Sequence, residues 1–276
     1  MKIANFLSLA ILLLTLLSAP HAEAAGTIEK KVGKHRILGY PTSPLLPWTN
    51  GKYRVHDANR PVPPYQADAK PTTTPPVAGA TVLFDGNRPD KENLANWNGG
   101  WKIDPKEKCL VASRGNFSTK EAYGDCQLHL EWQVPAKADT HWPNRGNSGV
   151  LLMSKYEIQI YDSHPQHELQ LYPDGQAASV YGQTPPKVNV SLPGGKWQSY
   201  DITFTAPKFD AAGKLVTRGK VTVLHNGVEV HKDQEIYGTI AHQRLPGQKP
   251  HPAKLPLTLQ GHGSPVKFRN VWIKGE

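Results

Sequence analysis

Short segments in which apolar and polar side chains alternate make up the chain from residue 80 onward. The segment 128–133 reads LHLEWQ, 156–160 reads YEIQI and 201–204 reads DITF. Successive side chains of a strand point to opposite faces of a sheet, so this alternation predicts strands with one buried face. The same region lacks the apolar spacing of a long amphipathic helix.

The last third of the chain carries a hairpin signal. Apolar runs at 221–224 and 228–230 flank Asn226-Gly227, a dipeptide that favours the positive φ angles of a type I′ turn. Two more strands are expected at 255–260 and 266–273. Many short strands at regular spacing are typical of an all-β sandwich or barrel, and an antiparallel jelly roll fits this length.

Residues 25–79 differ in composition from the rest of the chain. They are rich in proline, which fixes φ and removes a backbone donor, so regular sheet or helix is not expected there. Leu46, Trp48 and Tyr53 can nevertheless pack onto another surface. We therefore predict an ordered, Pro-rich N-terminal arm that lies over a domain at 80–276 and ends in a flexible stretch at 71–76.

Residues 1–24 have the pattern of a signal peptide. Lys2 precedes an apolar run at 6–17, and Ala22-Glu23-Ala24 offers the small residues that signal peptidase reads. The run is short for a bilayer span. We expect export to the periplasm or the cell exterior, with no stable membrane span after cleavage. An uncleaved N-terminal anchor is the alternative.

Charge and cysteine usage narrow the choice of partners. The net charge is +9, but the basic residues are scattered and no nucleic-acid-binding motif occurs, so we expect no nucleic acid partner. Cys109 and Cys126 fall in two expected strands. A disulfide between neighbouring strands is one interpretation, and two buried free thiols are the other. The oligomeric state is left open.

The block 145–163 concentrates polar side chains along an expected strand. Alternation places Glu157 and Gln159 on one face, about 7 Å apart. Carboxylates and amides bind sugar hydroxyls, so a polar row on a curved sheet favours a sugar-binding groove. An ordinary solvated face is the alternative. Further polar candidates lie on a second strand, in the loop after residue 160 and in the turn 261–263: His129, Glu131, Asp174, Gln176, Tyr181 and His262.

Metal and nucleophile chemistry have weaker signals. His164-x-x-His167-Glu168 has a spacing found at metal sites, but it falls in an expected loop without the helix of the His-Glu-x-x-His motif. A divalent metal ion stays open as a cofactor, because Asp and backbone oxygens can hold calcium on such a fold. The sequence contains no Gly-x-Ser-x-Gly elbow, P-loop or dinucleotide fingerprint.

The motifs resemble, in order, those of the 3-keto-disaccharide hydrolase domain family. They read NSGVLL, YEIQIYDS, DGQA, YGQTPP, WQSYDITFTAP, VTVLHNGV and LQGHGSPVKFRNVWI, and the resemblance covers Thr81 to Lys274. It implies a concanavalin A-like jelly-roll β-sandwich that cleaves glycosides whose sugar carries a ketone at C3. One departure is Gly261, where relatives commonly have Asp before His-Gly. If that Asp orients the histidine, this chain lacks the orienting group.

The implied reaction suggests roles for the polar residues. A ketone at C3 acidifies the C2 proton, so the glycosidic oxygen can leave by β-elimination and water can then add back. This needs a base, an acid and a positive group near the C3 oxygen. We expect Glu157 or His262 as the base, the other or Glu131 as the acid, and Arg145 or a metal ion beside the enolate. The expected substrate-binding residues are Asn147, Gln159, Asp162, Asp174, Gln176 and Tyr181.

These roles require Glu157 and Gln159 to face a hollow that His262 and Arg145 also reach. A non-catalytic, lectin-like carbohydrate-binding module would use the same residues and is the alternative function. A structural protein of the envelope is a third. The fold alone does not decide between them.

Overall fold

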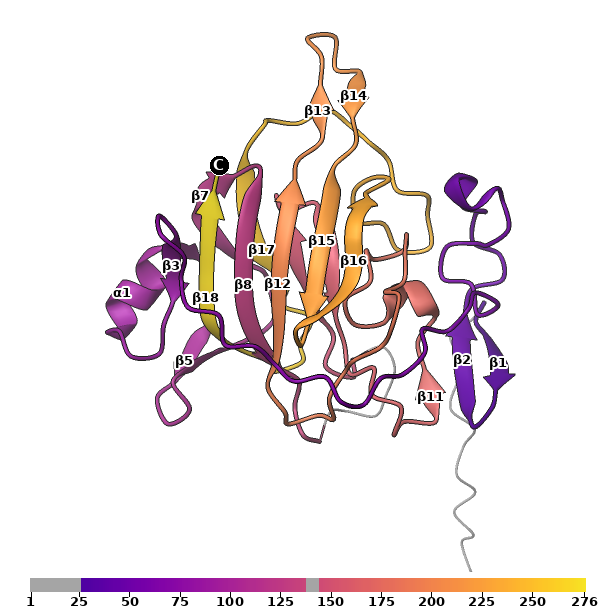
Figure 1. Cartoon of the computed structure of the whole chain (residues 1–276), viewed down its shortest axis with the longest axis horizontal. Coiled ribbons are helices and arrows are strands. Elements are labelled where there is room, and N and C mark those ends of the chain that lie inside the picture. Colours follow the sequence, from indigo (N-terminus) through magenta and orange to yellow (C-terminus); the bar gives the residue numbers. More distant parts are fainter. Residues whose placement is uncertain (1–25, 138–143) are drawn as a thin grey trace, which may run out of the picture.

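Two antiparallel sheets packed face to face form the body of the molecule (Figure 1). The structure is a computed structural model that describes residues 26–137 and 144–276. In these residues the larger sheet has the order β16-β15-β12-β8-β18-β6-β5, and β3 also pairs with β18. Its strands are β3 (Thr81–Phe84), β5 (Lys102–Asp104), β6 (Cys109–Val111), β8 (Cys126–Gln133), β12 (Gln198–Thr205), β15 (Lys220–His225), β16 (Val228–Glu235) and β18 (Lys267–Gly275).

The smaller sheet has the order β10-β9-β17-β7-β4, with β10 at one edge. Its strands are β4 (Trp97–Asn98), β7 (Phe117–Tyr123), β9 (Ser148–Leu152), β10 (Tyr156–Ile160) and β17 (Leu255–Leu259). Outside the two sheets lie β1 (Ile28–Val32), β2 (His35–Gly39), β11 (Leu169–Gln170), β13 (Lys208–Phe209) and β14 (Leu215–Thr217), together with the helices α1 (Asp90–Ala95), η1 (Pro47–Thr49) and η2 (Pro173–Gly175).

The core lies between the two sheets and follows the sequence alternation. Leu130 and Trp132 of β8 face Ile158 and Ile160 of β10 within one buried apolar cluster. Each fully buried aliphatic side chain contributes about 2 kcal/mol relative to an exposed one. The prediction of an all-β jelly-roll sandwich is confirmed, and the polar residues between these apolar positions are left facing away from the core.

The predicted hairpin forms as expected. Strands β15 and β16 pair antiparallel with His225 opposite Val228, and the φ angles of Asn226 and Gly227 are 50° and 76°. Both central residues therefore adopt the left-handed conformation of a type I′ turn, which Asn and Gly tolerate best.

The N-terminal arm contacts β11 and the larger sheet. The expectation that residues 25–79 lack regular sheet is wrong for 28–39, where strands β1 and β2 form a hairpin, because the prolines of the arm begin only at Pro41. Strand β2 pairs in parallel with β11, and the chain then crosses the outer face of the larger sheet to reach β3 (Figure 1). The stretch 71–76, expected to be flexible, is held there: the Thr72 amide donates to Ser199 Oγ at 2.9 Å and Trp272 Nε1 donates to the Thr74 carbonyl at 2.8 Å. The extended chain uses polar side chains that β12 and β18 turn outward.

Of the two interpretations of Cys109 and Cys126, the structure agrees with the buried free thiols and not with the disulfide. Cys109 and Cys126 are buried free thiols on β6 and β8, and β18 lies between these strands. Cys126 pairs with Gly275, whereas Leu110, next to Cys109, pairs with Phe268 near the other end of β18. About six residues of strand, roughly 20 Å, separate the two positions, whereas a disulfide needs Cα atoms within about 7 Å.

The predicted signal peptide, residues 1–24, lies outside the described residues. Among the helices of 26–137 and 144–276, none combines the length and the apolar character that crossing a membrane requires.

Candidate active site

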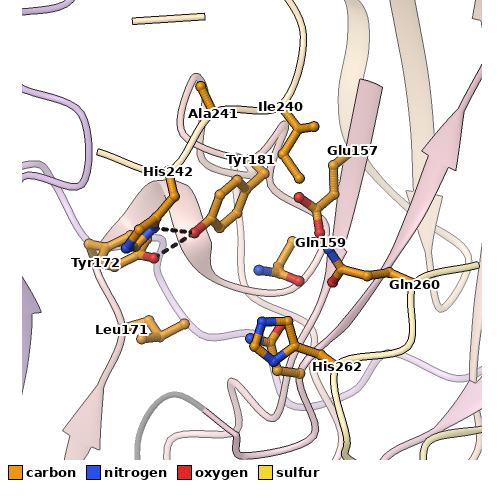
Figure 2. A pocket seen from close by; sticks show the side chains of 11 residues that line it. Glu157, Gln159, Leu171, Tyr172, Tyr181, Ile240, Ala241, His242, Gln260 and His262 are labelled. Atoms are coloured by element: carbon orange, nitrogen blue, oxygen red, sulfur yellow. Dashed lines mark hydrogen bonds between the residues drawn. The ribbon is translucent and has the colours of Figure 1, made fainter. Parts of the chain in front are cut away.

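A pocket of about 470 Å³ lies beside β10, on the face of the smaller sheet that points away from the core. It is open to solvent on one side and lined by polar and aromatic side chains together (Figure 2). The lining residues are Asn147, Glu157, Gln159, Leu171, Tyr172, Tyr181, Ile240, Ala241, His242, Gln260 and His262.

Strand β10 places Glu157 and Gln159 in the pocket because Ile158 and Ile160 point into the core. The free edge of β10 is covered by the segment 178–181, since the Ala178 amide donates to the Gln159 carbonyl at 2.9 Å and the Tyr181 amide to the Glu157 carbonyl at 3.1 Å. This pairing fixes Tyr181 beside the two polar side chains. The structure therefore brings together Glu157, Gln159 and Tyr181, three of the residues expected at the site.

Gly149 of β9 makes room for the Glu157 carboxyl. It is the register partner of Gln159, and a Cβ atom at this position would lie 2.3 Å from Glu157 Oε1. Any side chain at position 149 would push the carboxyl out of its place. The glycine of the NSG motif thus contributes space rather than a backbone angle.

Glu157 is buried without a charged partner. It is 3% exposed, and burial raises its pKa to about 8. Within the described residues, neither its Oε2 atom nor Gln159 Oε1 has a hydrogen-bond partner. Buried polar atoms in native proteins almost always find partners. Two adjacent orphaned oxygens in a solvent-connected pocket indicate a site that a polar ligand completes.

The raised pKa predicts a pH-dependent stability that Glu157→Gln removes. Below pH 4.5 the carboxyl is protonated in both the folded and the unfolded chain, whereas between pH 4.5 and 8 only the unfolded chain releases the proton. The wild type therefore loses stability as pH rises through this window, and the variant does not. Each of the roughly 3.5 pH units between the two pKa values contributes about 1.4 kcal/mol, so we expect the variant to gain on the order of 5 kcal/mol over the wild type at pH 9 and nothing at pH 4.

Urea denaturation at pH 4, 6.5 and 9 measures this difference. Glu121→Gln, at an exposed carboxylate of β7, serves as the matched control and should follow the wild type at every pH. An equal loss of stability in Glu157→Gln and the wild type between pH 4 and 9 would show that this carboxyl is not buried as described.

An aromatic wall, formed by Tyr172, Tyr181 and His242, faces the polar row across the pocket (Figure 2). The Tyr181 hydroxyl is hydrogen-bonded to the Tyr172 hydroxyl at 2.9 Å and to His242 Nδ1 at 3.0 Å. Burial, helped by neighbouring His56 and His262, lowers the pKa of His242 to about 4, so this imidazole is neutral at physiological pH. Flat apolar faces of this kind can stack on a sugar ring.

His262 lies at the rim of the pocket and is exposed. Its backbone forms a bridge with Arg114, which fixes the Gly-His-Gly turn against the segment 113–115. A Cβ atom at Gly261 would lie 2.1 Å from the carbonyl oxygens of both Ser113 and Gly115. The chain therefore has no room for a side chain at this position, including the Asp that the family resemblance led us to expect there.

Arg145 and Asp162 do not line the pocket, contrary to the expectation for both. Arg145 Nε and Nη1 donate to the carbonyls of Asp162 and Leu169 at 3.1 and 2.8 Å, and its guanidinium lies over the Tyr161 ring. The Asp162 carboxylate accepts from His167 Nε2 at 2.7 Å. Both side chains brace the loops beside the pocket, and neither reaches the polar row.

Asp174 and Gln176 lie behind the aromatic wall. Both are fully buried and neither lines the pocket. Gln176 Nε2 donates to the Leu171 carbonyl at 3.3 Å, and Asp174 binds side chains of the N-terminal arm. They were expected to bind substrate, but they support residues that line the pocket.

Glu131 lies on the opposite side of the molecule, so its expected catalytic role is wrong. Leu130 and Trp132 face the core, which sends Glu131 to the outer face of the larger sheet. There its carboxylate accepts from Arg269 Nε at 2.7 Å and from Asn270 Nδ2 at 3.1 Å. His129 shares this face and is hydrogen-bonded to Asp201 at 2.7 Å.

A metal site is not apparent in the parts of the chain that the structure describes. No group of three or more His, Cys, Asp or Glu side chains gathers there in a metal-binding arrangement. His167 is bound to Asp162, and His164 Nε2 is hydrogen-bonded to the Tyr65 hydroxyl at 3.1 Å. The divalent metal ion stays a prediction.

Six lining residues were missed at the sequence level, and three of them carry polar side chains: Tyr172, His242 and Gln260. Gln260 stands in the motif LQGHG, directly before the turn that carries His262, and alternation after Thr258 places it on the pocket face. His242 has no such signal. It lies in a segment without regular structure whose path depends on tertiary packing.

A jelly-roll sandwich with a polar and aromatic pocket of this kind defines a glycosyl hydrolase-like or carbohydrate-binding protein. The chain belongs to the family of 3-keto-alpha-glucoside-1,2-lyase-like domains, whose model matches residues 79–274. This confirms the resemblance seen in the sequence motifs.

The solved structures that resemble the chain agree with this family. A crystal structure of an inferred glycosyl hydrolase from Parabacteroides distasonis ATCC 8503 is 33% identical, with a TM-score of 0.67 over 79% of this chain and 93% of that one. A second inferred glycosyl hydrolase from the same organism is 20% identical, with a TM-score of 0.52 over 72% and 94% of the two chains, and shows the fold alone. The comparison with curated proteins gives no match.

Proposed function

We propose that this protein is an exported carbohydrate enzyme that cleaves glycosides whose sugar carries a ketone at C3, by elimination followed by hydration. The observation that carries the proposal is the buried Glu157 carboxyl, which faces the pocket with an unpartnered oxygen and a pKa of about 8. A base is most effective when its pKa lies near the working pH. The lyase-like family and the signal-peptide pattern of residues 1–24 support the same proposal.

In this mechanism the C3 ketone makes the C2 proton acidic, and ionised Glu157 removes it. The electron pair left at C2 is delocalised onto the C3 oxygen as an enolate. When this electron pair forms the C1–C2 double bond, the C1–O bond breaks and the leaving oxygen takes a proton from His262. Water then adds its oxygen to C1 of the resulting enone, C2 regains a proton, and the sum is hydrolysis.

The developing charge on the C3 oxygen needs hydrogen-bond donors. Arg145 does not line the pocket, so the proposal assigns this role to the side-chain amides of Asn147 and Gln260, which do. Neutral donors that are already in position can stabilise an enolate as its charge develops. The aromatic wall would stack on the sugar ring.

A lectin-like module without catalysis is the second candidate. The observation that favours it is Gly261, because His262 then lacks an adjacent carboxylate that could orient or charge the imidazole. The same polar row and aromatic wall would bind a sugar without cleaving it.

Turnover of a 3-keto-α-glucoside, compared with the same glucoside bearing an ordinary C3 hydroxyl, tests the proposal. We expect the ketone alone to release its leaving group, and product formed in D₂O to carry deuterium at C2, measured by NMR. Saturable binding of either glycoside without product would support the lectin-like module. If the protein neither bound nor cleaved either glycoside, both candidates would be contradicted.

A further inference from the structure

The arm segment 40–60 packs behind the aromatic wall and lies outside the family match at 79–274. The His56 ring stacks on the Tyr172 ring with centroids 3.9 Å apart and an interplanar angle of 28°. Its centroid is 5.0 Å from that of Tyr181 and 5.1 Å from that of His242. One arm residue, with no exposed surface of its own, thus touches all three members of the wall.

Asp174 holds His56 in place. The His56 backbone amide donates to Asp174 Oδ2 at 3.0 Å and the ring Nδ1 to Oδ1 at 3.4 Å. Arg60 completes the cluster, donating to Asp174 Oδ2 at 3.3 Å and to the Gln183 carbonyl at 2.8 Å. Burial opposes ionisation of Asp174, but the charges and hydrogen bonds of His56 and Arg60 outweigh it, and its pKa lies below the ordinary value.

His56 also has a left-handed backbone, with φ of 56°. Residues other than glycine adopt this conformation at a cost, and they keep it where surrounding contacts determine it. Here those contacts are the two hydrogen bonds to Asp174 and the stack on Tyr172. The contacts of His56 with Asp174 and Tyr172, rather than its intrinsic backbone preference, therefore determine its left-handed conformation.

The wall comes from two separate loops, because Tyr172 and Tyr181 belong to 171–182 whereas His242 follows β16. Within the wall, the hydrogen bond that joins the two loops runs between the Tyr181 hydroxyl and His242 Nδ1. We propose that the arm completes the pocket, with His56 as a positioning residue that fixes the two loops of the aromatic wall relative to each other. This inference rests on the proposed function only in taking the wall as the surface that binds the sugar.

His56→Asn is the sharpest test. Asn tolerates positive φ and keeps a donor for Asp174, but it lacks the ring that touches the wall. With a chromogenic 3-keto-glucoside we expect KM to rise about tenfold while kcat stays within twofold, because His56 touches neither Glu157 nor Gln159. A lower kcat at unchanged KM would indicate a smaller folded fraction and would overturn the proposal, as would unchanged KM and kcat.

Tyr65→Phe is the matched control in the same arm. Its hydroxyl is hydrogen-bonded to His164, away from the wall, so the variant should keep the wild-type KM and kcat. A rise in KM equal to that of His56→Asn would show a general effect of disturbing the arm and would contradict a specific role for His56.

A second measurement needs no substrate. The NMR titration of His242 reports whether the wall stays closed, since burial holds its pKa at about 4 and the groups around it are His56, His262, Tyr181 and Tyr40. In His56→Asn, water enters the space of the lost ring, and we expect this pKa to rise by at least one unit. An unchanged titration would overturn the inference. If the wild type bound and cleaved no glycoside, the proposed function would fail while this titration still decided the role of His56.

Discussion

Glu157→Gln is expected to lower kcat for a 3-keto-glucoside by 10²- to 10⁴-fold, the range typical for loss of a general base. The amide has nearly the shape of the protonated carboxyl, so it fits the space above Gly149 and keeps the pocket intact. It cannot accept the C2 proton. Binding of the substrate, measured by calorimetry, should therefore stay within a few-fold of the wild type.

Two comparisons sharpen this result. Glu121→Gln, on the exposed face of β7, should leave kcat unchanged. Glu157→Gln should be inactive and at the same time more stable than the wild type at high pH, because burying an ionised carboxyl serves chemistry at the expense of stability. Activity within tenfold of the wild type would rule Glu157 out as the base.

Gly261→Ala is expected to destabilise the fold by about 2–3 kcal/mol, the cost of forcing extra atoms into a filled space. The added Cβ atom would meet two backbone carbonyl oxygens at 2.1 Å, and backbone cannot move aside as a flexible side chain can. Relief requires the 113–115 segment or the His262 turn to shift, so substrate turnover should fall as well. Urea denaturation and kcat measure the two effects.

Gly100→Ala provides the control, because Gly100 is exposed, has an ordinary φ and has nothing within 4 Å of an added Cβ atom. We expect it to change stability by less than about 0.5 kcal/mol. If Gly261→Ala were equally harmless, the turn could accept a side chain, and close packing against Ser113 and Gly115 would not restrict position 261.

Local pattern sufficed for the strands with clear alternation after residue 80 and for part of the pocket. Alternation at 156–160 identifies the core face and so places Glu157 and Gln159 together, and the Asn226-Gly227 signal depends only on backbone angles. Alternation does not say on which side of the sandwich an outward residue lies. Glu131 points outward from the larger sheet and Glu157 from the smaller sheet. The sequence alone could not show that these two carboxylates lie on opposite sides of the molecule.

Strand order and loop paths lie beyond local pattern for the same reason. Cys109 and Cys126 stand on strands close in sequence, yet β18 from the end of the chain inserts between them. His56 and His242 reach the pocket wall only because the arm and a late loop pack on each other. Such contacts depend on the whole fold. From the sequence, one can predict only which residues of a single strand share a face.

The separation of Cys109 from Cys126 has a consequence for how the protein withstands its surroundings. Burial raises the pKa of the two thiols to about 11 and about 12, so almost no reactive thiolate exists at neutral pH. Oxidants act mainly on thiolates that solvent can reach. Because the two thiols lie too far apart to form a disulfide in this fold, we expect its stability to be the same under reducing and oxidising conditions.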